Sequence, residues 1–234
     1  MIKMKATRLL VCFILLFVEL CFPEPLYSQK LQRIKQLPVR ESKSAGNSDY
    51  YIILLTGNGG RQHLVQSVTS YLKLMNISVL TINTKLYLLS EKRPAQIACD
   101  LENLMDSYTK KWGQQKIIFI GYSMGAEVLP FAINCMGKNY NDKIADLILI
   151  GPGQKVTFKI KLRDYYLNVN KGVDLFPEIV KMKKGYVICD DNEFSICRLG
   201  LDGIIEYDFL GGGHHFGGDY LALSRLIGKR LNLK

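Results

Sequence analysis

The chain of 234 residues lacks several features that define other classes of protein. Its longest apolar run, Leu9–Leu20, has only about a dozen residues and contains Glu19, which is too short to cross a membrane comfortably. It has no internal repeat and no low-complexity tract. Its cysteines lack the spacing of a zinc site, so we predict no metal ligands and no cofactor. Only three histidines occur, which leaves few candidates for a functional imidazole.

Nucleic-acid binding is not expected either. The sequence has no basic stripe interleaved with aromatic residues and no known nucleic-acid motif. Its glycine-rich loop Gly57-Asn58-Gly59-Gly60 lacks the Gly-Lys-Ser/Thr ending of a phosphate-binding loop. The chain nevertheless carries a formal net charge of +10. That charge fits an anionic partner such as a phospholipid surface, or it serves solubility alone.

The N-terminus has the pattern of a secretory signal. Lys3, Lys5 and Arg8 precede the apolar run, and Leu26-Tyr27-Ser28 offers a cleavage site before Gln29. We therefore predict that residues 1–28 are removed on export and that the mature protein is soluble. An uncleaved N-terminal anchor and a lipoprotein processed at Cys21 are the alternatives. Because residues 1–28 have a net charge of +1, the mature chain keeps about +9 of the total.

Four cysteines remain after such cleavage. Cys189 and Cys197 flank one short loop and form the predicted pair, because an exported chain meets oxidising conditions. Closing this loop would contribute about 2–3 kcal/mol to stability. Cys99 and Cys135 lie in predicted helices, where we expect buried thiols.

From residue 50 to residue 234 the pattern alternates between strands and helices. Such alternation predicts one α/β domain with a doubly wound, mostly parallel sheet, and residues 29–49 form a linker with a predicted edge strand at Leu37–Glu41. Lys155–Tyr165 has the pattern of an exposed strand. About thirty-five residues separate the fourth and fifth of the main strands, which leaves room for only a minimal lid. The predicted strands are Tyr50–Thr56, Ile77–Ile82, Ile117–Ile120, Asp146–Ile150, Tyr186–Cys189 and Ile204–Phe209, and the predicted helices are Gln62–Met75, Pro94–Trp112, Ala126–Met136 and Tyr220–Leu231.

Residues 121–125 spell G-x-S-x-G between a predicted strand and a predicted helix. This is the setting of a nucleophile elbow, in which a sharp turn lifts a serine hydroxyl above the sheet. Glycines on either side tolerate the crowding and the unusual backbone angles of the turn. We therefore predict that Ser123 is a catalytic nucleophile.

A serine nucleophile needs a base, and the glycine-rich loop at residues 211–218 supplies His214 and His215. This loop follows the last strand and precedes the last helix, where the base of an α/β-hydrolase belongs. We favour His215, because a histidine directly before phenylalanine recurs at this place in the fold. His214 is then expected to support the base or to contact the substrate.

The third member of the triad is expected just after the strand Tyr186–Cys189. Asp190, Asp191 and Glu193 all lie there, and the usual spacing favours Glu193, with Asp191 as the close rival. Its role would be to orient the histidine and stabilise the imidazolium. Backbone N–H groups of Met124 and of Asn58 or Gly59 are the predicted oxyanion donors.

Several longer segments resemble one family. Gly121–Pro130 is similar to the G-Y-S-F-G-A-D-V-L-P motif of the bacterial virulence protein VirJ/AcvB family, and Gly212–Tyr220 is similar to its G-G-H-H-F-D-G-D-Y motif. Leu55–Gly60 and the region from Lys85 to Pro94 also resemble family segments. The resemblance extends from about Leu37 to the end of the chain. Departures include Asn58 in place of aspartate and Gly217 in place of aspartate.

The resemblance implies an exported α/β-hydrolase that is periplasmic and hydrolyses the aminoacyl ester of aminoacyl-phosphatidylglycerol. It assigns Ser123 as nucleophile and His215 as base, and it suggests secretion-system proteins as partners. Two other functions stay open. One is a non-catalytic binding or chaperone-like protein on a hydrolase scaffold, and the other is a generic carboxylesterase or thioesterase.

Overall fold

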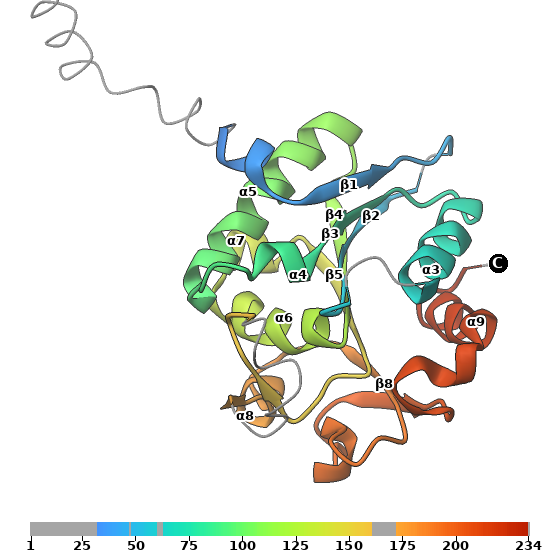
Figure 1. The fold of residues 1–234 in the computed structure, drawn as a ribbon. Helices are drawn as coiled ribbons and strands as arrows, with labels where there is room; N and C mark the ends of the chain where they lie inside the picture. Colours follow the sequence, from blue (N-terminus) through green and yellow to red (C-terminus); the bar gives the residue numbers. More distant parts are fainter. Residues whose placement is uncertain (1–31, 47, 60–62, 161–171, 234) are drawn as a thin grey trace, which may run out of the picture. The chain divides into compact units, whose positions relative to one another are not determined.

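The computed structural model describes residues 32–46, 48–59, 63–160 and 172–233. The chain divides into two compact units, residues 1–36 and residues 37–234. In the first unit, residues 32–36 are helical. The second unit contains every strand and helix named below (Figure 1).

A seven-stranded sheet forms the centre of the second unit, in the order β1-β3-β2-β4-β5-β8-β9. Only β1 runs antiparallel, and it pairs with β3 at one edge, where the sequence predicts an edge strand. The other neighbours are parallel. The predicted doubly wound, mostly parallel sheet is confirmed. The strands are β1 (Val39–Ser42), β2 (Tyr50–Leu55), β3 (Val79–Ile82), β4 (Lys116–Tyr122), β5 (Ile144–Ile150), β8 (Tyr186–Cys189) and β9 (Glu206–Phe209).

The central strands are mostly apolar because both of their faces are covered. Strand β4 lies between β2 and β5, and six of its seven residues are buried. Helices α3 (His63–Leu74) and α9 (Tyr220–Arg230) contact each other and pack on one face with Ile52 and Leu54 of β2. On the other face, α5 (Pro94–Trp112) contacts α6 (Met124–Cys135) (Figure 1). Tyr51 of β2 donates its hydroxyl proton to the Met105 carbonyl of α5.

Some elements differ from the sequence prediction. The predicted strand Lys155–Tyr165 is wrong for residues 157–160, because only β6 (Lys155–Val156) is extended and pairs with β7 (Val173–Asp174). The remainder of that prediction, residues 161–165, lies outside the described residues. Three short helices have no predicted counterpart, α4 (Thr84–Tyr87), α7 (Lys138–Asn141) and α8 (Phe176–Val180). Each is too short to show a hydrophobic period in the sequence. No helix in the described part of the chain has both the length and the apolar character to span a membrane.

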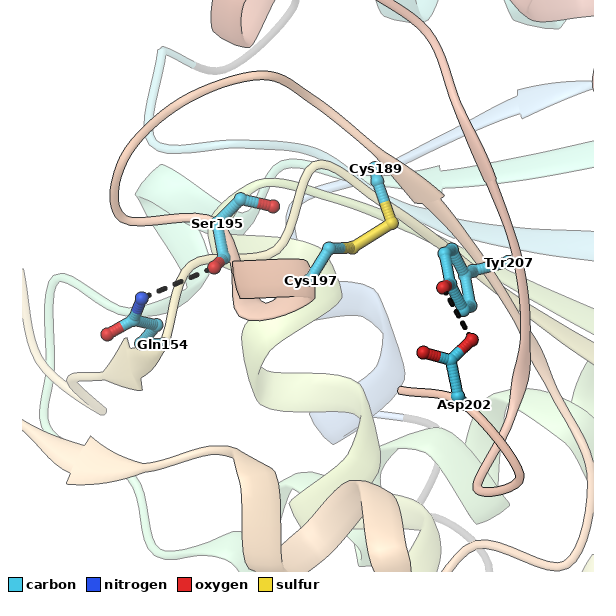
Figure 2. The surroundings of a disulfide bond; sticks show 6 residues. All are labelled: Gln154, Cys189, Ser195, Cys197, Asp202 and Tyr207. Atoms are coloured by element: carbon cyan, nitrogen blue, oxygen red, sulfur yellow. Dashed lines mark hydrogen bonds between the residues drawn. A yellow bond between two sulfur atoms is a disulfide. The ribbon is translucent and has the colours of Figure 1, made fainter. Parts of the chain in front are cut away.

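The predicted disulfide between Cys189 and Cys197 is present, with Cα atoms 6.0 Å apart. Figure 2 shows it tying the end of β8 to the short helix η2 (Ile196–Leu199). The expectation of buried thiols is wrong, because Cys99 and Cys135 are exposed. Cys99 points to solvent because the opposite side of α5 supplies the buried face with Ile97, Ala98 and Leu101.

Candidate active site

Four loops meet at the carboxyl ends of the parallel strands. Ser123 follows β4, Asp190 follows β8, and His214 lies in the loop after β9. Gly57 lies just beyond β2, and a Cβ atom on it would come 3.2 Å from the Cβ of Ser123. The carboxyl ends of parallel strands are where open α/β sheets form their sites.

The turn at Ser123 has the geometry of a nucleophile elbow. Ser123 has φ 52° and ψ −122°, a conformation that few residues other than glycine adopt. A Cβ on Gly121 would lie 2.6 Å from the Ala126 backbone, and one on Gly125 would lie 2.3 Å from the Leu55 carbonyl oxygen. Only glycine fits these two positions, which explains the spacing of the motif. The turn directs the Ser123 side chain outward from the start of α6.

Ser123, His214 and Asp190 form a continuous hydrogen-bonded chain. His214 Nε2 lies 2.8 Å from Ser123 Oγ, and His214 Nδ1 lies 2.7 Å from Asp190 Oδ2. A carboxylate can only accept, so Nδ1 carries the proton and Nε2 is free to accept from the serine hydroxyl. The Asp190 side chain is 2% exposed and that of His214 is 33% exposed. This arrangement can deprotonate Ser123 as it attacks an acyl carbon.

The position of the predicted base is therefore corrected from His215 to His214. Gly212 and Gly213 have positive φ, and a Cβ on Gly212 would lie 2.3 Å from the Gly217 nitrogen, so the loop turns back on itself. Phe216 is 1% exposed and packs into the core below the sheet edge. With Phe216 directed inward, the neighbouring His215 is directed outward and is exposed. His215 Nδ1 lies 2.9 Å from the hydroxyl of Tyr122.

The position of the predicted acid is also corrected, from Glu193 or Asp191 to Asp190. Strand β8 ends at Cys189, whose carbonyl accepts from the Leu210 N–H, so Asp190 is the first residue beyond the sheet and is still buried. The next side chain, Asp191, points to the opposite side and is exposed. Glu193 is exposed as well and does not contact either histidine.

Asp191 has a different task in this structure. Its carboxylate accepts from the N–H groups of Gly213 at 2.6 Å and of Gly212 at 3.3 Å. These two N–H groups hold the pKa of Asp191 below its usual value. Asp191 therefore fixes the loop that presents His214, although it does not touch the imidazole.

Tyr122 supports the same imidazole from the side of β4. Its ring stacks on His214 with centroids 5.5 Å apart and 23° between the planes. Its hydroxyl lies 3.1 Å from the His214 carbonyl oxygen. Burial raises the pKa of Tyr122, so the hydroxyl stays neutral and available as a donor.

The predicted oxyanion donors, Met124 and Asn58 or Gly59, belong to the two segments that adjoin Ser123. Met124 is the first residue of α6, and its N–H has no acceptor within the helix. Asn58 and Gly59 form the turn after Gly57, which passes beside Ser123. The donor roles stay predictions.

A pocket of about 170 Å³ opens beside Ser123 and His214. Its lining includes a carboxyl group that the sequence analysis missed, that of Glu127, one helical turn after the serine. The Gly153 N–H donates to Glu127 Oε1 at 3.2 Å. Burial raises the pKa of Glu127 to about 7, although the Gly153 N–H and the charge of His214 oppose the shift. The signal available in the sequence was the spacing, since residues i and i+4 share one face of a helix. A larger hollow of about 730 Å³ lies along β9 and includes none of the triad residues.

Several solved structures have a similar fold. Est1E from Butyrivibrio proteoclasticus is 13% identical with a TM-score of 0.58, and the match covers 83% of this chain and 94% of that one. The enol-lactonase from Burkholderia xenovorans LB400 is 15% identical with a TM-score of 0.61 and coverage of 84% and 96%. An alpha-beta serine hydrolase homologue from Coxiella burnetii is 15% identical with a TM-score of 0.55 and coverage of 82% and 90%. At such low identity these likenesses show the α/β-hydrolase fold alone.

No curated protein matches the sequence. The model of one protein family does match it, over residues 49–234, a range that includes β2 to α9 and all three residues of the hydrogen-bonded chain. That family is described as bacterial virulence protein (VirJ). On this match, and with the α/β-hydrolase fold, the chain belongs to the VirJ family of bacterial virulence proteins.

Proposed function

We propose that this protein is an exported serine esterase that cleaves the aminoacyl ester of an aminoacyl-phospholipid such as aminoacyl-phosphatidylglycerol. The observation that carries the proposal is the hydrogen-bonded chain from Ser123 through His214 to Asp190. Solved esterases and serine hydrolases of similar fold fit the general reaction class, and the aminoacyl-phospholipid substrate rests on the resemblance to the VirJ/AcvB family. In this proposal Ser123 is the nucleophile, His214 the general base and Asp190 the residue that orients the imidazole.

The reaction would proceed in two halves. His214 Nε2 takes the Ser123 proton as Oγ forms a bond to the acyl carbon, and the Met124 N–H stabilises the oxyanion with an N–H from Asn58 or Gly59. The imidazolium then gives its proton to the leaving alcohol of the lipid headgroup as the ester bond breaks. Water, deprotonated by His214, attacks the acyl-enzyme, and the amino acid leaves as Ser123 regains its proton.

The choice of substrate draws on two further features. The pocket beside Ser123 has a volume of about 170 Å³, below the range of pockets that enclose a drug-sized ligand. It would take a short acyl group and leave the lipid outside. The net charge of +10 favours approach to an anionic membrane surface.

The periplasm is the proposed location. The signal-like residues 1–28 and the Cys189–Cys197 disulfide support it, because such bonds persist in oxidising compartments. Secretion-system partners remain a proposal that rests on the family alone.

The direct test uses Ser123→Ala on vesicles that contain lysyl- or alanyl-phosphatidylglycerol. We expect the wild type to release free amino acid and the variant to lose at least about 10³-fold in rate while it stays folded. A fluorophosphonate probe should label Ser123 in the wild type. Undiminished turnover in the variant would refute the nucleophile. Labelling with hydrolysis of short-chain esters, but not of the aminoacyl-lipids, would instead indicate a generic esterase.

A further inference from the structure

Glu127 is a carboxyl group of the pocket that the triad does not use. It lies on the first turn of α6, and its backbone N–H donates to the Ser123 carbonyl, so its position relative to the nucleophile is fixed by the helix. Within the described residues, the only hydrogen bond to its carboxylate comes from Gly153. It is paired with no lysine or arginine in that part of the chain, which leaves acceptor capacity facing the pocket.

Ser195 is another polar residue in the lining of the same pocket. It is 2% exposed, and among the described residues its hydroxyl has no hydrogen-bond partner. Figure 2 shows this hydroxyl pointing away from Gln154, which bonds the Ser195 carbonyl instead. Gly153 joins the two groups, because it donates to Glu127 and forms a β-bridge with Ser195. A buried polar atom without a partner is costly, and a donor group of a ligand in the pocket would satisfy it.

The charge of this pocket is opposite to that of the whole molecule. Its described lining contains two carboxyl groups, Glu127 and Asp190, with His214 as the single basic side chain among them and no lysine or arginine. The chain as a whole has ten more basic than acidic residues. Asp190 binds His214 through Oδ2, and its Oδ1 is buried without a hydrogen-bond partner among the described residues. Glu127 is therefore the carboxyl group of the lining that is not bound to the histidine. An acidic pocket of this kind favours a ligand with a positive charge.

We propose that Glu127, with the Ser195 hydroxyl, binds a primary ammonium group on the acyl part of the substrate. This inference rests on the proposed esterase function and deepens it, because it makes Glu127 the residue that separates aminoacyl esters from plain acyl esters. An ammonium has three donors and no acceptor, which matches a carboxylate and a hydroxyl oxygen. Bound at Glu127, one helical turn from Ser123, the ammonium would hold the acyl carbon near the nucleophile. The raised pKa of Glu127 fits a carboxyl group that pairs with no lysine or arginine among the described residues and would gain its counter-charge from a ligand.

Four glycerol esters test the inference. The propionyl and alanyl esters differ by an α-ammonium group, and the hexanoyl and 6-aminohexanoyl esters differ by a distal one. We expect the wild type to favour one or both ammonium-bearing esters in kcat/KM by at least about thirtyfold, as a desolvated charge pair allows. The ester pair that shows the preference identifies whether the site binds an α-ammonium or a distal ammonium group.

Three variants complete the design. Glu127→Gln keeps an acceptor for the Gly153 N–H and removes the charge, so it should abolish the preference and leave turnover of the plain esters within about threefold. Glu127→Asp should restore part of the preference. Glu193→Gln removes an exposed carboxylate nearby and should change nothing. Equal use of both esters by the wild type, or an equal loss on both in Glu127→Gln, would overturn the inference, because the second result means that Glu127 acts through His214.

A binding measurement separates this inference from the proposed function. Titration of alaninamide and propionamide into Ser123→Ala, followed by NMR shifts, should show tighter binding of alaninamide that Glu127→Gln removes. If no ester is hydrolysed but this preference holds, the cation site stands and the esterase proposal fails. If hydrolysis occurs and both amides bind alike, the cation site fails alone.

Discussion

His214 Nε2 lies 2.8 Å from Ser123 Oγ, although the two residues are 91 positions apart in the sequence. The neighbouring His215 faces the Tyr122 hydroxyl and is exposed. Two adjacent histidines thus occupy different environments, and only one can take a proton from the serine. The difference can be measured directly.

Replacing each histidine by alanine should separate their roles. We expect His214→Ala to lower kcat for ester hydrolysis by about 10²–10⁴-fold, the range for loss of a general base. His215→Ala should stay within about tenfold of the wild type, because its ring does not reach Ser123. Steady-state kinetics with circular dichroism as a folding check decides the matter. Equal losses in the two variants would contradict the assignment of His214.

The acid can be tested by isosteric changes in the loop after β8. Asp190→Asn leaves the side-chain shape but stabilises the wrong tautomer of His214, so kcat should fall by about 10³–10⁴-fold. Glu193→Gln serves as the matched control and should leave kcat unchanged, since Glu193 contacts neither histidine. A larger loss in the control than in Asp190→Asn would restore Glu193 as the acid.

Glu127 should make stability depend on pH. Its pKa is raised from 4.5 to about 7, which means that the folded protein holds this proton more tightly than the unfolded chain. The stabilisation is complete below about pH 4.5 and is lost as the pH rises through 7. Glu127→Gln cannot ionise, so between pH 4.5 and 7.5 its unfolding free energy should rise relative to the wild type by up to about 3 kcal/mol.

Urea denaturation at several pH values measures this difference, with Glu193→Gln as a control whose curve should parallel the wild type. Parallel curves for Glu127→Gln and the wild type would show that Glu127 ionises normally in the fold. If Glu127 serves function rather than stability, replacing it by glutamine should stabilise the protein at neutral pH.

The disulfide should stabilise the acid loop, because Cys189 directly precedes Asp190. Replacing Cys189 and Cys197 together by serine opens a loop with a sequence separation of 8 residues. The free energy of unfolding should fall by about 2–3 kcal/mol. This loss corresponds to a Tm lower by about 5–10 °C. Calorimetry under oxidising conditions gives the result, and the reduced wild type should behave like the double variant. An unchanged Tm in both would mean that the bond does not constrain the loop.

The sequence alone determined the fold class and the position of the sharp turn that presents Ser123. Continuous apolar strands alternating with amphipathic helices permit few arrangements besides a parallel sheet covered on both faces. The turn at Ser123 has no space for a side chain at position 121 or 125. The glycines at both positions can be read directly from the sequence. The Cys189–Cys197 pair also followed from spacing and the expected compartment.

The tertiary structure decided which histidine reaches Ser123 and which acid reaches that histidine. His214 and His215 are adjacent, as are Asp190 and Asp191, and the side chains of each pair point in different directions. Those directions depend on where a strand ends and how a loop turns. The burial of Phe216 in the core sends His214 toward the serine, while the end of β8 at Cys189 sends Asp190 inward and Asp191 outward. The role of Glu127 could not be predicted from the sequence either. The pocket around its carboxyl group forms only when the distant Gly153 and Ser195 pack near the start of α6. Such long-range packing leaves no local pattern in the sequence. Sequence patterns therefore predict which loops form the site, and only the three-dimensional contacts show which side chains in those loops meet.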